Sequence, residues 1–458
     1  MGVSTFKGGV HPYDGKELAK DQAIVELKPQ GLMVYPLSQH IGAPAKPIVA
    51  KGDHVLVGQK IAEAGGFISA PVLSAVSGTV KGIEKRLTAG GAIMDAIVVE
   101  NDQQYDAIPG FGEPRDYTKL TRDEIVNIVK EAGIVGLGGA GFPTNVKLMP
   151  KNIDKIDHFL VNGAECEPYL TSDYRDMIET PDEIIGGLKV VLSIFPNAKG
   201  IICIEDNKPD AIQKLTEMCK NEERISVAAL KTKYPQGGER QLIYAVTGRR
   251  INSSMLPADA GVVVDNADTL VAIYEAVCLQ KPLVRKIVTV TGDAVVKPGN
   301  FKVPLGTNYQ EIVAAAGGFK ADPEKIISGG PMMGIPMFKL DVPLVKNSSS
   351  ILAFLHDPVS AQPTTACINC GRCVSACPEN LIPTMLMKAA LHKNTADFAK
   401  LQGMECIECG CCAYACPAKR PLTQGFKMMK RLVGAERRAA AAKAKAQEEA
   451  KKNEEVKK

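Results

Sequence analysis

The feature that most constrains this chain is a cysteine motif that occurs twice near its C-terminal end. Each copy has the spacing Cys-x2-Cys-x2-Cys-x3-Cys followed by proline, and the copies begin 39 residues apart. Thiolates are soft ligands that suit iron–sulfur clusters, and this spacing is typical of proteins with two [4Fe–4S] clusters. We therefore predict two clusters. The eight cysteines are Cys367, Cys370, Cys373, Cys377, Cys406, Cys409, Cys412 and Cys416.

The fourth cysteine of each copy is predicted to serve the other cluster, as the two-cluster ligation rule requires. The first cluster would then take Cys416, and the second would take Cys377. Zinc is the alternative, but zinc sites typically use two pairs of ligands. Two pairs of zinc ligands do not explain a run of four cysteines that ends in Cys-Pro and occurs twice. Cys411 is interpreted as an extra thiol and not as a ligand.

The metal-type spacing of the eight motif cysteines favours a reducing compartment over a secreted disulfide protein. Four of the remaining cysteines are scattered along the chain. We expect these four to pack in the core. They are Cys166, Cys203, Cys219 and Cys278.

The chain has 458 residues, which is too long for one ordinary core. No apolar run reaches the roughly 18–20 residues of a membrane helix. The net charge of +4 does not argue for nucleic acid. Changes in pattern along the chain predict five sections. They are a β-rich section 1–112, a parallel α/β section 113–283, a small α+β module 284–350, a mostly helical cluster section 361–433 and a charged tail 434–458.

The α/β section shows strands and helices in alternation, which is typical of a parallel sheet. A helix is predicted from Thr121 to Gly133, because threonine caps helices and glycine ends them. Short apolar runs predict the strands that follow. They cover 159–161, 200–204, 225–230 and 261–264.

A glycine-rich loop, Gly136 to Thr144, follows the first helix of this section. A dinucleotide loop would follow a strand instead. Dense glycines still allow the backbone to approach a phosphate or a ring closely, and Lys147 could reach a phosphate as a point charge. A tight structural loop is the alternative interpretation.

Three stretches resemble the flavin site of the flavoprotein subunit of respiratory complex I. They are Gly136–Lys147, Asn162–Pro168 and Tyr234–Arg240. Nearly the whole chain, from Lys7–Pro12 to both cysteine motifs, resembles the C subunits of Rnf electron-transport complexes more closely. The complex I flavoprotein carries a single, different cluster motif. The resemblance implies an N-terminal barrel-sandwich domain, a parallel α/β FMN/NAD domain, a β-grasp module and an α-helical ferredoxin domain with two [4Fe–4S] clusters.

The resemblance also implies non-covalent FMN, with NAD(H) as substrate, and it assigns residues to both. Glu167 and Glu239 would lie near the nicotinamide as catalytic residues, and Phe142 would stack near the adenine. The implied cofactor-binding residues are Gly136, Gly138, Gly139, Gly141, Phe142, Lys147, Asn162, Glu165, Gly237, Asp265 and Asn266.

Four positions depart from the family pattern and concern the adenine contacts more than the flavin. Leu137, Ala164 and Gly238 replace a usual Arg, Asp and Glu. Pro150 stands where the complex I family has an aromatic residue.

The function implied is that of an NAD(H)-reactive, ferredoxin:NAD oxidoreductase subunit. Hydride exchange between NAD(H) and FMN would feed one-electron transfer through the clusters, and partner subunits would couple it to ion transport. The implied partners are membrane-embedded subunits and a ferredoxin-reactive iron–sulfur subunit, with ferredoxin itself indirect. The implied location is peripheral, on the cytoplasmic face of the membrane, without a transmembrane segment.

Two other functions stay open. One is a non-catalytic electron-relay and assembly subunit with a degenerate flavin site, which the departures motivate. The other is a subunit similar to those of heterodisulfide reductases, which leaves the glycine loop unexplained.

Two parts of the chain have no predicted chemistry. The N-terminal section resembles a lipoyl-like domain, but its hairpin from Gly65 to Ser69 has no lysine to modify, so we interpret it as structural or docking. The tail is interpreted as a solvated helix or disordered segment. A weak contact with an acidic partner or a lipid surface is the alternative.

Overall fold

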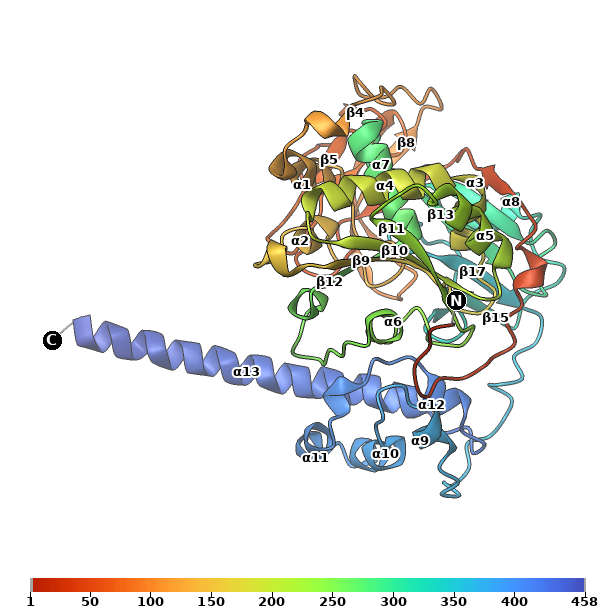
Figure 1. The fold of residues 1–458 in the computed structure, drawn as a ribbon, viewed down its shortest axis with the longest axis vertical. Coiled ribbons are helices and arrows are strands. Elements are labelled where there is room, and N and C mark those ends of the chain that lie inside the picture. Colours follow the sequence, from red (N-terminus) through yellow and green to blue (C-terminus); the bar gives the residue numbers. More distant parts are fainter. Residues whose placement is uncertain (1–2, 457–458) are drawn as a thin grey trace. The chain divides into compact units, whose positions relative to one another are not determined.

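The computed structural model describes residues 3–456 and divides into two compact units (Figure 1). The first unit contains residues 3–5 and 12–357. The second contains residues 6–11 and 358–456. A short N-terminal segment therefore belongs to the cluster-bearing unit, although residues 12–357 separate it from the rest of that unit.

The N-terminal section forms two small antiparallel sheets around an apolar core. Met33, Tyr35, Ile61 and Ile97 are fully buried in this core, because alternate side chains of a strand point to opposite faces. One sheet has the order β2 (Leu32–Pro36), β8 (Ile93–Asn101), β7 (Gly78–Leu87), β4 (His54–Val55). The other has the order β3 (Lys46–Pro47), β5 (Lys60–Glu63), β6 (Val72–Leu73).

Two short N-terminal segments pair with sheets of later sections. Ser4 forms an isolated parallel bridge with Leu230. Strand β1 (Ile24–Glu26) pairs in parallel with β14 (Gly299–Pro304). The start of the chain therefore ties three sections of the first unit together through backbone hydrogen bonds.

The α/β section contains a four-stranded, fully parallel sheet with the order β11-β10-β9-β12. Its two faces are covered by different helices, because Phe159 and Val161 pack with α4 and α7, whereas Leu160 packs with α6 (Figure 1). The strands are β9 (His158–Gly163), β10 (Lys199–Glu205), β11 (Ile225–Leu230) and β12 (Val262–Asn266). The helices are α1 (Arg122–Glu131), α2 (Thr144–Lys147), α3 (Ser172–Glu179), α4 (Pro181–Ile194), α5 (Pro209–Met218), α6 (Glu239–Thr247) and α7 (Ala267–Cys278).

The predicted signals for the first helix act as expected. Thr121 and Glu124 form a capping box, in which the side chain of each residue accepts a hydrogen bond from the backbone N–H of the other. Gly133 follows the helix with φ +68°, a conformation that favours glycine. The prediction of a helix between these two residues is confirmed.

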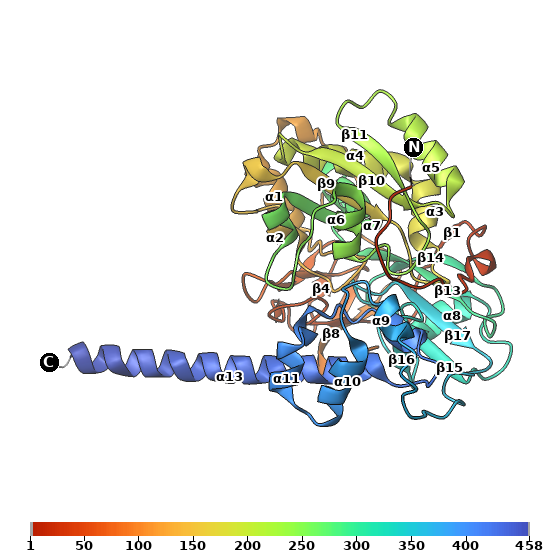
Figure 2. The same ribbon diagram turned by 60° about the horizontal axis from the view of Figure 1, so that its bottom comes forward.

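The β-grasp module is a six-stranded mixed sheet with the order β1-β14-β13-β17-β15-β16, accompanied by helix α8 (Tyr309–Ala315) (Figure 2). Strand β17 begins at the predicted end of the section, residue 350, and extends beyond it to Phe354. The remaining strands are β13 (Arg285–Thr291), β15 (Lys325–Ser328), β16 (Ile335–Met337) and β17 (Ser350–Phe354). Short 3-10 helices occur at Lys16–Leu18, Tyr117–Lys119, Ile153–Lys155, Pro257–Ala260 and Gly403–Glu405.

The second unit is helical and packs around Leu386, Phe398, Phe426 and Met429. Its last helix runs without a break through residue 434, so the part of the predicted tail that is described continues a packed helix. The helices are α9 (Arg372–Ala376), α10 (Pro383–Leu391), α11 (Thr395–Lys400), α12 (Cys411–Tyr414) and α13 (Leu422–Val456).

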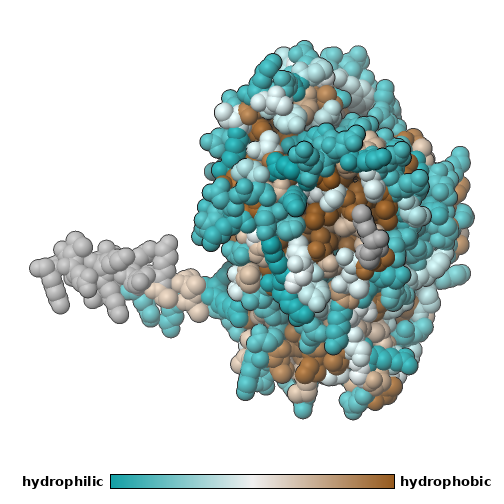
Figure 3. All heavy atoms as spheres, in the orientation of Figure 1, coloured by the Kyte–Doolittle hydropathy of each residue, from teal (hydrophilic) through white to brown (hydrophobic). Residues whose placement is uncertain are grey.

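Among residues 3–456, no helix combines the length and the apolar character needed to cross a membrane. Hydrophilic side chains cover most of the face drawn in Figure 3, and hydrophobic ones gather in smaller areas between them.

Candidate functional sites

The parallel sheet has a point where its strand order reverses direction. From β9 the chain adds β10 and β11 on one side and then returns to place β12 on the other side. In open parallel sheets, ligands bind outside the carboxyl ends of the strands at such a switch point. β9 ends at Asn162–Gly163 and β12 ends at Asp265–Asn266, so the topology brings these predicted site residues together.

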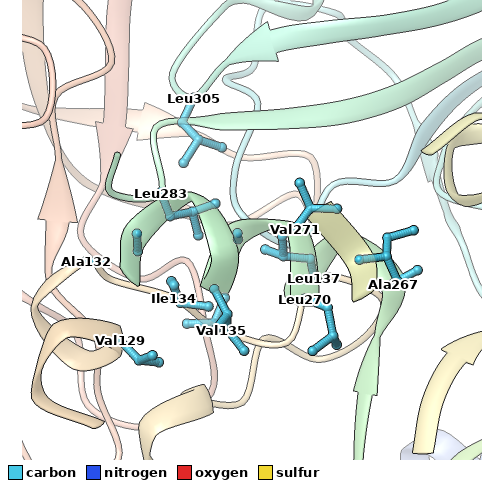
Figure 4. Close-up of a cluster of buried hydrophobic side chains, with 14 of the residues drawn as sticks. Val129, Ala132, Ile134, Val135, Leu137, Ala267, Leu270, Val271, Leu283 and Leu305 are labelled. Atoms are coloured by element: carbon cyan, nitrogen blue, oxygen red, sulfur yellow. The ribbon is translucent and has the colours of Figure 1, made fainter. Parts of the chain in front are cut away.

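The glycine loop is closed at its base and held down by one core side chain. Gly136 N–H donates to Phe142 O at 2.9 Å, and Thr144 N–H donates to Ile134 O at 3.1 Å. Leu137 is fully buried beside residues of α7 (Figure 4), and its N–H donates to Thr269 Oγ1 at 3.0 Å. The departure at Leu137 therefore serves packing of the loop.

The exposed part of the loop, residues 138–140, differs in the space around each glycine. A methyl group on Gly138 would lie 2.9 Å from the Asn266 side chain, whereas one on Gly139 would meet nothing within 4 Å. Gly141 has φ +71°, and a methyl group there would lie 3.1 Å from His40 Cα of the N-terminal section. The loop thus rests on β12 at one point and on the barrel-sandwich domain at another.

Lys147, the last residue of α2, lies next to this loop. Its Nζ donates to Asp265 Oδ1 and to Val264 O, both at 2.8 Å. Burial raises the pKa of Asp265, and the nearby ammonium opposes this shift. A phosphate that reached Lys147 would share it with Asp265.

The segment after β9 is fixed on both sides by hydrogen bonds. Asn162 Nδ2 donates to Gly237 O at 2.8 Å, which joins the second and third resemblance stretches. Glu165 adopts φ +47°, and its Oε1 accepts from Asp173 N–H at 2.7 Å. Burial raises the pKa of Glu165 to about 7.

The two predicted catalytic glutamates lie in different surroundings. Both carboxylate oxygens of Glu167 accept backbone N–H groups, from Met332 at 3.1 Å and from Met333 at 2.9 Å. Glu239 is exposed at the first position of α6, within electrostatic reach of Lys147 and Asp265. Glu239 therefore shares its surroundings with the predicted flavin residues, whereas Glu167 is held by the β-grasp module.

Two buried lysines and one cysteine of this site were not identified from the sequence. Lys16 Nζ donates to Glu165 O at 2.9 Å and to Glu167 O at 3.1 Å, and Lys208 Nζ donates to Ala164 O at 2.7 Å. No local pattern marks a lysine as buried, so sequence reasoning had no signal for either.

Cys166 was expected in the core, and this expectation is wrong. It is half-buried, and its Sγ accepts a hydrogen bond from Gly237 N–H at 3.2 Å. The resemblance stretch from Asn162 to Pro168 already contained it. Cys203, Cys219 and Cys278 are buried, as predicted.

Several buried polar atoms of this site have no hydrogen-bond partner among the described residues. They include both amide atoms of Gln236 and Asp265 Oδ2. Glu165 Oε2 also lacks a hydrogen bond, but it forms an ion pair with Lys16 Nζ at 3.7 Å. Buried polar atoms of this kind normally have partners, so each calls for an explanation. A ring system with its own donors and acceptors, such as a flavin, would supply partners. The residues present therefore fit FMN.

The cluster unit repeats its backbone conformation at the spacing of its cysteine motif. Three positions with positive φ recur 39 residues later, and in each copy a left-handed glycine precedes a short helix that carries the third cysteine. The pairs are Asn369 (+55°) and Glu408 (+61°), Gly371 (+74°) and Gly410 (+84°), and Asn380 (+55°) and Lys419 (+50°).

The cysteines gather in the pattern expected for crossed ligation. One cavity is lined by Cys377 of the first copy together with Cys406, Cys409, Cys411 and Cys412 of the second. Cys373 lies within electrostatic reach of Cys416 and Cys370. Among the residues described, no three His, Cys, Asp or Glu side chains converge as a site for a single metal ion.

Burial raises the pKa of Cys377 and raises that of Cys406 to about 11, and backbone N–H groups beside this cavity oppose the shift. Leu381 N–H donates to Cys377 Sγ and Glu408 N–H donates to Cys406 Sγ, both at 3.4 Å. Backbone N–H groups that point at sulfur favour its charged form. A hydrogen bond from the Cys411 thiol lowers the pKa of Cys409, so this extra cysteine lies beside a predicted ligand.

Four family models match the chain, each inside one of the predicted sections. They are the RnfC barrel sandwich hybrid domain at residues 4–104, the Nuo51 FMN-binding domain at 129–275, the SLBB domain at 287–336 and the 4Fe-4S dicluster domain at 366–419. The predictions of fold class, FMN and two [4Fe–4S] clusters are confirmed by these matches.

Three curated relatives show the family. The C subunit of the proton-translocating ferredoxin:NAD(+) oxidoreductase complex of Clostridium ljungdahlii is 43% identical over 84% of this chain and 84% of its own. The Na(+)-translocating counterpart of Acetobacterium woodii is 42% identical over 95% of this chain and 98% of its own. The C subunit of the ion-translocating oxidoreductase complex of Rhodobacter capsulatus is 39% identical over 93% of this chain and 82% of its own.

A crystal structure of air-oxidized NAD+-reducing [NiFe]-hydrogenase resembles this chain in fold alone. The TM-score is 0.51 at 22% identity, covering 70% of this chain and 64% of the matched one.

The α/β domain with its glycine loop and the two-cluster unit define the class of protein, an iron–sulfur flavoprotein of electron transfer. Within that class, the chain belongs to the RnfC family, the C subunits of ion-translocating oxidoreductase complexes.

The buried Glu165 carboxyl predicts a pH effect on stability. Its pKa rises from an ordinary 4.5 to about 7 on folding, so the folded state keeps a proton that the unfolded state has lost. This stabilisation is fully present below pH 4.5 and is lost as the pH rises through 7. The unfolding free energy of wild-type protein should fall by at most about 1.4 kcal/mol per pH unit between pH 6 and 7 through this group.

Glu165→Gln should lack that contribution. Thermal unfolding of both proteins at pH 6, 7 and 8 measures it, with Glu63→Gln as the control because Glu63 is exposed. Equal pH dependence in wild type and Glu165→Gln would contradict the prediction.

Proposed function

We propose that this chain is the NAD(H)-reactive subunit of an Rnf-type complex. It would exchange a hydride between NAD(H) and FMN and pass single electrons through two [4Fe–4S] clusters to partner subunits, which would couple ferredoxin/NAD electron transfer to ion transport. The observation that carries the proposal is the meeting of the glycine loop with Asn162 and Asn266 at the switch point of the sheet. The same chain holds the two-cluster domain.

The residues that would hold FMN are the glycine loop, Asn162, Glu165, Gly237 and the pair Asp265–Asn266. Gln236 adds an amide whose two polar atoms have no partner among the described residues. Bound FMN supplies the conversion between a two-electron hydride step and single-electron steps. The protein supplies a backbone that allows close approach and one nearby cation in Lys147.

For the nucleotide, Phe142 and Glu239 are the proposed neighbours. Phe142 lies half-exposed at the end of the glycine loop, where its ring is available to an adenine. Glu239 would face the nicotinamide. Hydride transfer needs no acid or base, so Glu239 would act by orienting the substrate.

The proposed partners are the other subunits of the complex, including membrane-embedded subunits and a ferredoxin-reactive iron–sulfur subunit. Relatives are described as subunits of translocating ferredoxin:NAD(+) oxidoreductase complexes, which supports this assignment. The proposed location is peripheral, on the cytoplasmic face of the membrane.

Anaerobic addition of NADH to the purified holoprotein tests the proposal. We expect the oxidised flavin band to bleach and the cluster absorbance to fall afterwards, and acid precipitation of the same sample should release FMN. A protein that carries about eight iron per chain but releases no flavin would instead be the relay and assembly subunit.

A further inference from the structure

A loop of the β-grasp module reaches the segment that follows β9. The loop covers residues 329–334 and joins β15 to β16. Its Met332 and Met333 N–H groups donate to the two different carboxylate oxygens of Glu167, at 3.1 and 2.9 Å. Burial raises the pKa of Glu167 to about 7, and the two N–H groups oppose this shift because they favour the ionised carboxylate. Glu167 is therefore the point at which the β-grasp loop holds the flavin domain.

The fit between loop and carboxylate depends on a glycine. A methyl group on Gly330 would overlap the Glu167 carboxylate, so the Glu167 side chain lies directly on the Gly330 backbone. The loop itself is closed by a hydrogen bond from Gly334 N–H to Gly330 O at 2.8 Å. Any side chain at Gly330 must push the carboxylate away or open the loop.

The same module holds the far end of the segment through apolar contacts. Leu170 packs with Ile327 of β15 and Leu352 of β17. The ring of Tyr169 meets that of Phe354 edge-on, with centroids 5.3 Å apart and planes at 76°. Residues 167–170 are thus clamped to the β-grasp sheet at several points.

The segment also contains a backbone conformation that needs support. Glu165 has φ +47°, which costs a non-glycine residue of order 1–3 kcal/mol and persists only where the surroundings impose it. Lys16 supports the segment by donating to the carbonyls of Glu165 and Glu167. Only Cys166 separates Glu165 from Glu167 in the chain. A shift of the Glu167 backbone is therefore transmitted to Cys166 and Glu165.

We propose that the loop 329–334 clamps Glu167 and thereby fixes Glu165 and Cys166 in the flavin site. Glu167 is then a positioning residue and not one that touches the nicotinamide. The β-grasp module acts as a structural support of the redox site. This inference rests on the proposed function for its kinetic consequence, but the clamp itself is a property of the fold.

Gly330→Ala tests the clamp in the full-length holoprotein, with Gly299→Ala as the matched control. Gly299 begins β14 of the same sheet, and a methyl group there would meet only ordinary contacts of 3.6–3.9 Å. We expect Gly330→Ala to raise the KM for NADH, or to slow flavin reduction, by about tenfold. Iron content should be unchanged, and Gly299→Ala should behave like wild type.

Amide hydrogen exchange gives a second readout that needs neither NADH nor flavin. Gly330→Ala and Glu167→Gln should each speed exchange at residues 165–170 by about tenfold, because local opening becomes easier. Glu167→Gln keeps the side-chain size, so it reports on the carboxylate even where Gly330→Ala folds poorly.

The possible results separate the clamp from the proposed function. Unchanged exchange at residues 165–170 in both variants would overturn the clamp. Faster exchange with unchanged flavin kinetics would overturn the positioning role. Wild-type flavin that NADH does not reduce would instead refute the proposed function, and the exchange data would still decide the clamp.

Discussion

Replacing Cys377 with alanine should halve the iron of the protein, from about eight to about four atoms per chain. The cluster lost should be the one built mainly by the second cysteine copy. Cys377 lines one cavity together with Cys406, Cys409, Cys411 and Cys412. Cys411 is not a predicted ligand, so removal of Cys377 leaves the predicted cluster with three thiolates. Iron and acid-labile sulfide analysis after anaerobic reconstitution measures the loss.

Pairs of substitutions decide whether the ligation is crossed. If Cys377 and Cys406 serve the same cluster, Cys377→Ala combined with Cys406→Ala should still leave about four iron. Cys377→Ala combined with Cys367→Ala should leave almost none. The reverse pattern would show that each copy builds its own cluster. Cys411→Ser is the control, because Cys411 lies beside the predicted ligands without being one of them, and its loss should leave about eight iron.

Gly139→Val should abolish flavin binding while leaving both clusters in place. A methyl group on Gly139 meets no protein atom within 4 Å, and the residue does not have a positive φ. Valine should therefore fit the protein itself, and its side chain would occupy space over the loop where the flavin is proposed to lie. Flavin fluorescence in the acid supernatant, measured alongside iron content, tests this.

A control variant and a variant with a smaller expected effect accompany this experiment. Gly90→Val lies in the turn between β7 and β8 in similarly open space, so it should retain flavin. Lys147→Ala should weaken FMN binding by about 1–3 kcal/mol, because it removes a charged hydrogen-bond donor. It also leaves the buried Asp265 without its ion-pair partner. A Gly139→Val protein that releases as much flavin as wild type would show that the flavin does not lie over this loop.

Much of the fold could be predicted because its signals are local in the sequence. Thr121 and Gly133 mark a helix through capping and a left-handed terminus, and the structure places α1 between them. The apolar run 225–230 predicts a strand, and β11 has the same bounds. Such signals depend only on residues close together in the chain, so these elements can be predicted from a single sequence.

The candidate flavin site was predictable in its composition and less so in its contacts. Resemblance supplied Asn162, Glu165 and Asp265, and the parallel topology brings the strand ends that carry them together. The partner of Glu167 was not predictable, because Met332 and Met333 lie 165 residues or more away in the chain. The burial of Leu137, where a charged residue was usual, also follows from packing against α7.

The sequence by itself determined that this chain holds two clusters, because ligand type and spacing fix that chemistry within a few dozen residues. The tertiary structure alone decided which distant groups support the flavin site. Lys346 illustrates why such distant partners cannot be predicted from the sequence. It is fully buried and donates to Pro71 O at 2.6 Å and Gly133 O at 2.7 Å, and burial lowers its pKa to about 7. A lysine in a sequence looks like a surface residue, and only the packing of three sections around it turns it into an internal hydrogen-bond donor.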